Sequence, residues 1–274
     1  MKSMKISISN IAWDQPEEEA VAQILKERNI PGVEIAPTKI WTSPLEADPE
    51  SLSAYRRFWE DRGVEIVALQ ALLFGRPELT LFESQEKREQ AFQYLSQFIR
   101  LASALGAKVL VFGSPKNRLV GDRDPRKVME EAVDFFGRLG EVAFAHQTRF
   151  CIEPNAAVYG CDFIRTAREG QALVKRVDHP GFGLHLDAGI MTLNGEEIEP
   201  VLEECLETMA HFHISEPQLG LIGEGTTDHN RIAGHLRKIG YQGWVSIEMR
   251  NGLKSANPDS VRQALDFVIQ RYGQ

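Results

Sequence analysis

The sequence predicts an α/β fold, a (β/α)8 barrel formed as one domain by residues 1–274. Three observations lead to this fold. Short β-branched or apolar runs alternate with longer amphipathic stretches along the chain, eight of the short runs can be counted, and no glycine-rich turn follows the first of them. Strict alternation implies parallel strands joined by right-handed crossovers, and eight such units close into a barrel.

An open, doubly wound sheet is the alternative topology for the same alternation. Such sheets usually carry a glycine-rich phosphate-binding turn after the first strand. Here the first run leads into NIAWDQPEEE, at residues 10–19, which contains no glycine. The barrel is therefore favoured, and a chain of 274 residues suits it, because barrels of ~250 residues commonly form one domain.

The predicted strands lie within the eight short runs, at residues 4–14, 31–41, 63–75, 107–118, 149–157, 181–190, 209–217 and 243–252. The predicted helices lie between and after them, at 16–29, 49–61, 83–105, 125–146, 162–177, 196–209, 229–239 and 258–272. Pro16 and the glutamates after it are typical of a first helical turn. Gly63, Gly106 and Gly240 follow predicted helices, where glycine commonly ends a helix.

Composition narrows the class of protein. Hydrophobic residues make up 43% of the chain, enough for a large core, and the formal net charge of −8 argues against broad contact with nucleic-acid phosphates. Cys151, Cys161 and Cys205 form no CxxC pair, which fits a reduced setting without disulfides. No segment has the pattern of a cleaved leader or a membrane span. We therefore expect a soluble, cytoplasmic protein.

Four potential metal ligands stand where barrels place their active sites, at the carboxyl ends of the strands. They are Glu153 in FCIEPN, Asp187 in LHLDAG, His213 in HFHISEP and Glu248 in VSIEMR. They occupy the last four predicted strands, about one strand–helix–strand repeat of roughly 30 residues apart. Four such side chains on successive strands can converge on one point.

The alternation of side chains along each strand supports a shared site, since residues two apart lie on one face. The face of the four candidates also carries Cys151, Asn155, His185, His211, Ser215 and Ser246. The other face is apolar and suited to packing against helices: Ile152, Leu184, Leu186, Phe212, Ile214, Val245 and Ile247. A polar barrel interior with three carboxylates is unfavourable unless a cation pairs their charges. The sequence therefore predicts a divalent metal bound by the four candidates.

Three carboxylates and one imidazole suit Mn²⁺, with Mg²⁺ and Co²⁺ as alternatives and Zn²⁺ if the site is catalytic and open. Any single Glu or Asp at a strand end is more often a helix cap, a salt-bridge partner or a solvated residue. Three of them in register with a histidine make a shared site the better interpretation.

The segments IEPN, HLDAG, HFHISEP, GEG and GYQGWVSIEM, in this order and spacing, resemble the xylose-isomerase-like TIM-barrel family of sugar isomerases and epimerases. The motifs are nearest to ketose 3-epimerases, and the match is strongest over residues 149–250. The resemblance implies Mn²⁺ or a similar ion at the four positions. It also implies that Glu153 and Glu248 act as acid and base on opposite faces of a sugar, that Asp187 and His213 are ligands only, and that the protein forms a dimer or tetramer.

The sequence departs from ketose 3-epimerases at three positions where that branch handles the substrate's hydroxyl and carbonyl groups. Ile190 stands where a histidine is common, Leu219 where an arginine is common, and Tyr159 where a second glutamate is common. The metal ligands are kept while the substrate contacts are changed. The resemblance therefore supports metal-dependent sugar chemistry more strongly than 3-epimerisation of a ketose.

Seven further residues are candidates for substrate contact: His185, His211, Glu216, Lys116, Arg118, Asn155 and Trp13. His185 and His211 either touch substrate, brace the metal ligands, or are hydrogen-bonded interior histidines. Glu216 matches a family position near the substrate and equally suits a salt bridge within its loop.

Lys116, Arg118 and Trp13 also have two interpretations each. Lys116 and Arg118 follow the fourth strand and suit a hydroxyl-rich or anionic ligand, or a solvated basic loop. Trp13 and Glu34 end early strands, where their side chains could line the site. For Trp13, packing in the core is the alternative.

The leading prediction is a metal-dependent isomerase or epimerase that acts on a ketose, keto-sugar or related derivative through an enediolate. The alternative is a lyase or dehydratase that uses the same metal and base. An endonuclease-type hydrolase on a similar barrel is disfavoured by the acidic net charge. A binding protein with a degenerate site is disfavoured by the four intact ligands. The expected partner is a small sugar-derived molecule, not nucleic acid or a membrane.

Overall fold

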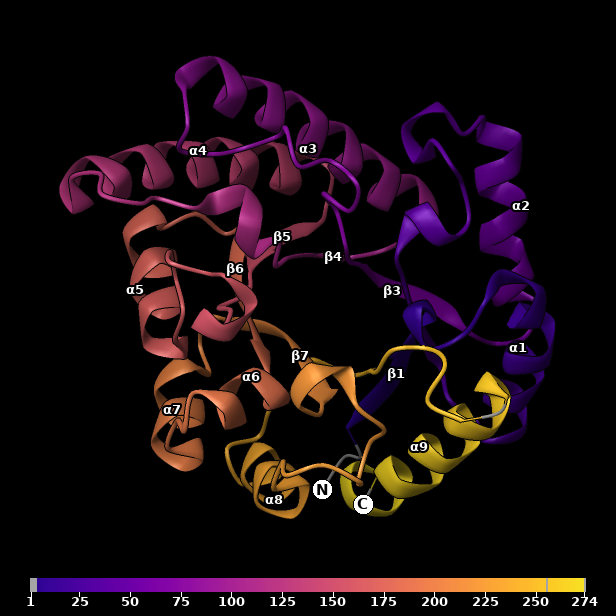
Figure 1. The fold of residues 1–274 in the computed structure, drawn as a ribbon. Helices are drawn as coiled ribbons and strands as arrows, with labels where there is room; N and C mark the ends of the chain where they lie inside the picture. Colours follow the sequence, from indigo (N-terminus) through magenta and orange to yellow (C-terminus); the bar gives the residue numbers. More distant parts are fainter. Residues whose placement is uncertain (1–3, 255, 274) are drawn as a thin grey trace.

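The computed structural model describes residues 4–254 and 256–273, and its eight parallel strands form a closed barrel in the order β1 to β8. The strands are β1 (Lys5–Ser9), β2 (Gly32–Ile35), β3 (Glu65–Leu69), β4 (Val109–Phe112), β5 (Arg149–Ile152), β6 (Phe182–Asp187), β7 (Met209–Ser215) and β8 (Trp244–Glu248). Figure 1 shows the helices as a ring around them. The predicted (β/α)8 barrel is confirmed.

Eight helices correspond to the predicted ones: α1 (Glu18–Glu27), α2 (Pro49–Glu60), α3 (Gln85–Leu105), α4 (Pro125–Ala145), α5 (Ala167–Val177), α7 (Ile198–Cys205), α8 (His229–Lys238) and α9 (Asn257–Tyr272). The helix predicted at 162–177 begins later, at Ala167. The reason is that Thr166 caps it and Glu169 completes a capping box. A short helix that the sequence did not predict, α6 (Ala188–Leu193), follows β6 directly.

The two faces of the strands separate apolar from polar side chains as predicted. The residues expected to face the helices are buried in one continuous core: Ile152, Leu184, Leu186, Phe212, Ile214, Val245 and Ile247. The buried polar residues His185, His211 and Ser246 belong to the opposite set. The last pairing, between β8 and β1, closes the barrel through Ser246 and Ser7.

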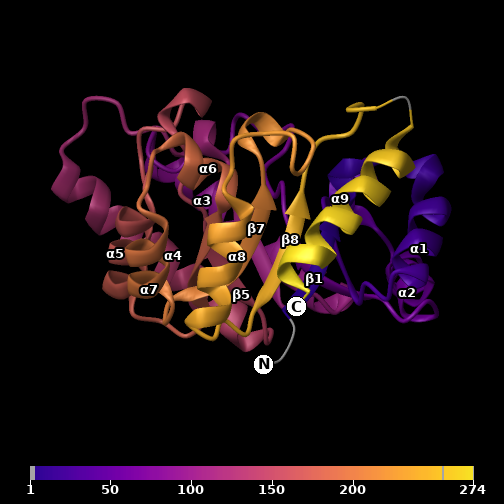
Figure 2. The same cartoon turned by 90° about the horizontal axis from the view of Figure 1, so that it is seen from below.

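The carboxyl ends of the strands share one edge of the barrel. Figure 2 shows the arrows of β7 and β8 pointing toward the edge where α6 lies, while both chain termini lie at the opposite edge. Two short 3-10 helices, η6 (Ala157–Tyr159) and η7 (Pro217–Leu219), follow β5 and β7 there. Within the described ranges, every helix is too short or too polar to span a lipid bilayer.

Candidate metal centre

The barrel brings the four predicted ligands to one point at this edge. Asp187 and Glu248 are the last residues of β6 and β8, and His213 lies opposite Asp187 in the pairing of β6 with β7. Glu153 directly follows β5, and its main-chain N–H donates to the carbonyl oxygen of Phe112 at 3.0 Å. One potential ligand atom from each of the four residues lies within 4.8 Å of the others.

The imidazole of His213 is buried with one nitrogen, Nδ1, facing the carboxylates. Nδ1 is 3.2 Å from Oε2 of Glu248 and 3.8 Å from both Oε1 of Glu153 and Oδ2 of Asp187. It has no hydrogen-bond partner among the described residues. Buried polar atoms are nearly always paired, so an unpaired nitrogen that faces three acidic groups fits a place in the ligand set of a cation.

The charges of the site favour the same interpretation. Burial, followed by the charges of Glu248 and Glu153, raises the pKa of Asp187 to about 7. Burial also raises the pKa of Glu153. Carboxylates that resist ionisation in this way are stabilised in their charged form when a divalent cation lies between them. The donor set of three carboxylates and an imidazole therefore fits a divalent metal.

Glu34 of β2 contacts the candidate site in a way that sequence reasoning missed. Its fully buried carboxylate lies 3.0 Å from Nε2 of His211 and 3.1 Å from Nε2 of His213. Although burial opposes it, the charges of His213 and His211 hold the pKa of Glu34 well below its usual range. A carboxylate on the far nitrogen of a ligand histidine fixes the ring and its tautomer. The clue in the sequence was a glutamate within the apolar run GVEI.

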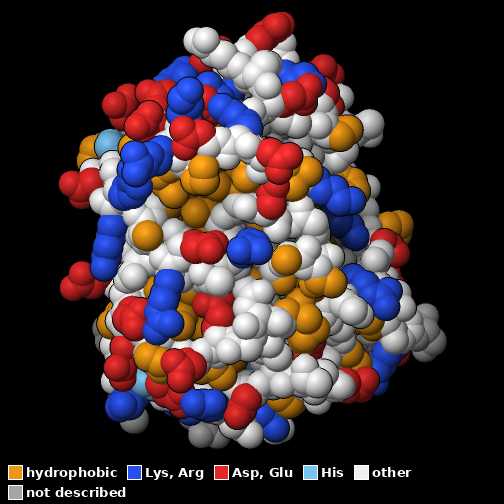
Figure 3. Space-filling model, turned by 60° about the vertical axis from the view of Figure 1, so that its left-hand side comes forward, with side chains coloured by type: hydrophobic (Ala, Val, Ile, Leu, Met, Phe, Trp, Pro, Cys, Tyr) orange, Lys and Arg blue, Asp and Glu red, His pale blue; other side chains and the backbone are white. Residues whose placement is uncertain are grey.

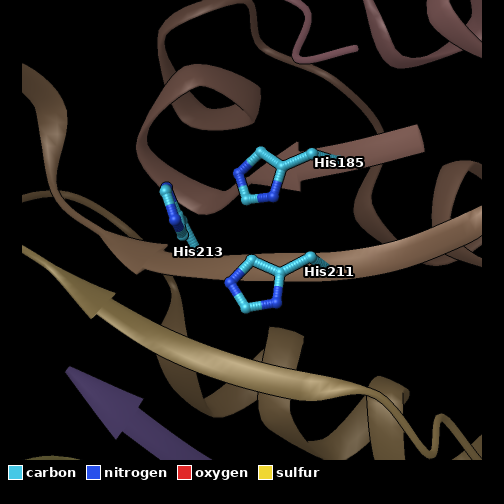
Figure 4. Close-up of side chains that lie close together, drawn as sticks. All are labelled: His185, His211 and His213. Atoms are coloured by element: carbon cyan, nitrogen blue, oxygen red, sulfur yellow. The ribbon is translucent and has the colours of Figure 1, made fainter. Parts of the chain in front are cut away.

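A second group of potential ligands, His185, His211 and His213, shares His213 with the first. Figure 4 shows the three rings gathered beside β6 and β7, with the ring centroids of His185 and His213 4.0 Å apart. Glu34 already engages Nε2 of both His211 and His213. The four-residue group keeps His213 Nδ1 for a metal without breaking these bonds, so it is the better candidate.

Three residues support Glu153. The amide nitrogen of Asn155 donates to Oε2 of Glu153 at 2.9 Å, and Nε2 of His185 lies 3.3 Å from Oε1. The buried guanidinium of Arg118 donates to the main-chain oxygen of Glu153 at 2.7 Å. Gly113 leaves the space that this carboxylate occupies, because a Cβ at that position would overlap Oε2. These contacts fix both the backbone and the carboxylate of Glu153.

Asp187 is held by the start of α6. Its Oδ1 accepts the N–H of Ile190 at 2.6 Å, and its Oδ2 accepts the hydroxyl of Ser215 at 2.6 Å. Ser215 in turn accepts the N–H of Gly189 at 2.8 Å. The unpredicted helix α6 thus orients a predicted ligand.

The other candidates for substrate contact lie in several environments. Trp13 is buried in the core, with its ring centroid 6.5 Å from that of Trp59. Lys116 is exposed, whereas Arg118 is fully buried, so the two do not form one solvated basic loop. The carboxylate of Glu216 accepts N–H groups from Gly223 and Thr227 and contacts His229, so its oxygens are engaged within its own loop.

Residues 22–271 match the sequence profile of the family described as xylose isomerase-like TIM barrel. The chain belongs to this family. A probable ketose 3-epimerase of Synechocystis is 24% identical over 253 residues, which cover 90% of this chain and 85% of that protein. A D-psicose 3-epimerase of Ruminiclostridium cellulolyticum is 29% identical over 125 residues, 46% of this chain and 42% of that protein.

Solved structures of two sugar epimerases have the same fold. D-psicose 3-epimerase from Clostridium cellulolyticum H10 with D-tagatose superposes with a TM-score of 0.82 at 19% identity, covering 99% of this chain and 100% of that one. The 3-keto-D-glucoside 4-epimerase from E. coli gives 0.79 at 18% identity, covering 97% and 99%. The proteins named here, to which this chain is similar, are described as epimerases.

Proposed function

We propose that this protein is a divalent-metal-dependent isomerase or epimerase that acts on a ketose or keto-sugar. One observation carries the proposal: Nδ1 of His213, unpaired among the described residues, faces two buried carboxylates and one half-buried carboxylate at the carboxyl edge of the barrel. Membership of the xylose isomerase-like family and the similarity to ketose and keto-glucoside epimerases support it. We infer an intracellular enzyme that forms dimers or tetramers.

Glu153, Asp187, His213 and Glu248 would hold the cation, and Mn²⁺ is the ion we propose for this oxygen-rich set. When bound, a divalent cation acidifies the C–H beside a sugar carbonyl and stabilises the negative charge that develops on oxygen. Asp187 and His213 serve only to bind, since Ser215 and Glu34 restrain them.

Glu153 and Glu248 would carry the proton. Burial raises the pKa of Glu153, which brings its carboxyl group nearer to the range in which a residue both takes and returns a proton at neutral pH. The two glutamates come from β5 and β8, so they approach the site from different sides of the barrel. One carboxylate removes the proton from carbon, and the other returns a proton to the opposite face.

A lyase reaction is the second candidate, because Ile190, Leu219 and Tyr159 differ from the residues that ketose 3-epimerases carry at these positions. One glutamate would then remove the proton from the carbon beside the carbonyl, and the other would protonate the β-hydroxyl group, which leaves as water while a C=C bond forms. A nucleic-acid substrate is less suited to this chain. On the face drawn in Figure 3, Lys and Arg side chains are interspersed with Asp and Glu, and the net charge is −8.

The proposal is tested with Mn²⁺-loaded protein and a panel of ketoses and 3-keto-glycosides in deuterated water. We expect deuterium to enter at least one sugar without loss of mass from the carbon skeleton. Glu153→Gln and Glu248→Gln should each lower the exchange rate by about 100-fold or more. Glu65→Gln, at an exposed strand position, is the matched control and should exchange like the wild type.

The outcomes separate the candidates. A product lighter by one water would identify the lyase. Exchange at the wild-type rate in both Glu153→Gln and Glu248→Gln would show that these residues are not the acid and base.

A further inference from the structure

A hydrogen bond joins two loops across the carboxyl edge of the barrel. The main-chain N–H of Gln218 donates to the hydroxyl oxygen of Tyr159 at 2.9 Å. Tyr159 ends η6, which follows β5, and Gln218 lies in η7, which follows β7. Because β6 lies between these strands in the barrel, the bond spans the strand end that carries Asp187.

The phenol of Tyr159 lies within electrostatic reach of the candidate metal centre. Burial raises the pKa of Tyr159, and the carboxylates of Asp187, Glu248 and Glu153 raise it further. The hydroxyl therefore stays protonated at neutral pH. The hydroxyl oxygen accepts the N–H of Gln218. The hydroxyl proton of Tyr159 has no hydrogen-bond acceptor within residues 4–254 and 256–273. That proton is free to be donated to a ligand.

The backbone holds the donor of this bond in an unusual conformation. Gln218 and Leu219 are consecutive non-glycine residues with φ of 61° and 56°, in the left-handed region. Such conformations persist only where the surroundings fix them, and they cluster at ligand-binding segments. Here the N–H of Leu219 donates to the oxygen of Glu216 at 3.0 Å, and the oxygen of Leu219 accepts the N–H of Arg250 at 3.0 Å. The place of the Tyr159 hydroxyl is therefore set by a fixed backbone.

We propose that Tyr159 contacts the substrate, donating a hydrogen bond from its hydroxyl to a sugar oxygen beside the metal centre. The identification of the ligand as a sugar rests on the proposed function. The phenol contributes a neutral donor, and three carboxylates stand nearby. This part of the site therefore accepts a carbonyl or hydroxyl oxygen and rejects a phosphate or carboxylate group. The substrate class is a keto-sugar that is uncharged at this end.

The test compares Tyr159→Phe, which removes only the hydroxyl, with Tyr55→Phe as the matched control. The Tyr55 hydroxyl donates to Glu18 at 2.7 Å, between outer helices α1 and α2. The probe is acetohydroxamic acid, a small chelator that mimics an enediolate, titrated calorimetrically into the Mn²⁺-loaded proteins. We expect its Kd to rise roughly tenfold in Tyr159→Phe, as for loss of one hydrogen bond to a charged group. The Tyr55→Phe protein should match the wild type, and all three proteins should bind Mn²⁺ equally.

Several results would overturn the contact. An equal hydroxamate Kd in Tyr159→Phe and the wild type would do so even if the wild type exchanges deuterium into sugars. A lower melting temperature with an unchanged hydroxamate Kd would assign Tyr159 only to holding the loops. Displacement of the hydroxamate by an equal concentration of sulfate would overturn the uncharged ligand class.

Failure of the proposed function gives a different pattern. The wild type would then exchange deuterium into no sugar of the panel, while the Tyr159→Phe protein would still bind the hydroxamate more weakly and so support the contact. Absence of hydroxamate binding to the Mn²⁺-loaded wild type would overturn both proposals.

Discussion

Nε2 of His213 lies 3.1 Å from each carboxylate oxygen of Glu34, while Nδ1 of the same ring faces three other carboxylates. The two nitrogens therefore have different partners on opposite sides of the ring. Glu34 accepts the Nε2 proton, which leaves the Nδ1 lone pair for a metal. The orientation of this ligand is set by a residue on β2, across the barrel from β7.

Replacing Glu34 with Gln should weaken Mn²⁺ binding by roughly 10- to 100-fold. The physical reason is that an amide presents only one acceptor oxygen to two imidazole N–H groups and turns its own N–H toward the other. Isothermal titration calorimetry measures the affinity, and the exposed Glu65→Gln should bind like the wild type. If Glu34→Gln bound Mn²⁺ as tightly as the wild type, Glu34 would not be orienting His213.

In metal-free protein, Asp187→Asn should raise the melting temperature by about 5 °C at neutral pH. Burial and the charges of Glu248 and Glu153 raise the pKa of Asp187 to about 7, so its ionised form destabilises the fold. A folded pKa above the unfolded value of about 4 means that this penalty develops as pH rises from about 4 to 7. The gain should therefore be absent near pH 4 and complete above pH 7.

The same two proteins, the wild type and Asp187→Asn, should also differ in how much Mn²⁺ raises their melting temperatures. Calorimetric scans should show that Mn²⁺ raises the melting temperature of the wild type strongly and that of Asp187→Asn weakly. The same Mn²⁺-dependent increase in both proteins would remove Asp187 from the ligand set.

Arg118 and Lys116 are two residues apart in sequence, but their replacement should affect stability very differently. Arg118 is fully buried and donates to the main-chain oxygen of Glu153, whereas Lys116 is exposed. Arg118→Met should lower the free energy of unfolding by roughly 3 kcal/mol, because it removes a buried cation from an acidic site. Lys116→Met should change it by less than about 0.5 kcal/mol. Urea unfolding tests both, and similar values for the two variants would contradict the buried role.

Glu216 should contribute stability that acid removes. Burial raises its pKa, but bonds from His229 and Thr227 outweigh burial and lower it to about 2. Since the unfolded value is about 4.3, the contribution is present above that pH and is lost as pH falls toward 2. Glu216→Gln should therefore lose about 2 kcal/mol at pH 7, and this loss should shrink between pH 4 and pH 2. Urea titrations at several pH values would refute this if the difference stayed constant.

The barrel could be predicted from the sequence because each of the eight repeats shows its own strand pattern followed by a helix pattern. Glu153, Asp187, His213 and Glu248 could be predicted because they stand at strand ends, a position that parity and spacing define. The short helix α6 could not be predicted, because six residues are too few to show an amphipathic helical pattern. Its first turn is instead set by the bond from Ile190 to Asp187.

Contacts distant in sequence account for the rest. Glu34 meets His211 and His213 across 177 and 179 residues, and no local pattern reveals such a pairing. The burial of Arg118 under Glu153 depends on how two loops pack, so the segment PKNR gave no sign of it. The bond between Tyr159 and Gln218 likewise joins separate loops, 59 residues apart.

The stoichiometry of Mn²⁺ binding most directly tests the central claim that Glu153, Asp187, His213 and Glu248 hold a single divalent cation. Metal analysis and calorimetry of the purified protein should give one Mn²⁺ per chain for the wild type. The double variant Asp187→Ala/His213→Ala should retain the circular dichroism of the wild type and lose that ion. An unchanged Mn²⁺ content and affinity in the folded double variant would contradict the account.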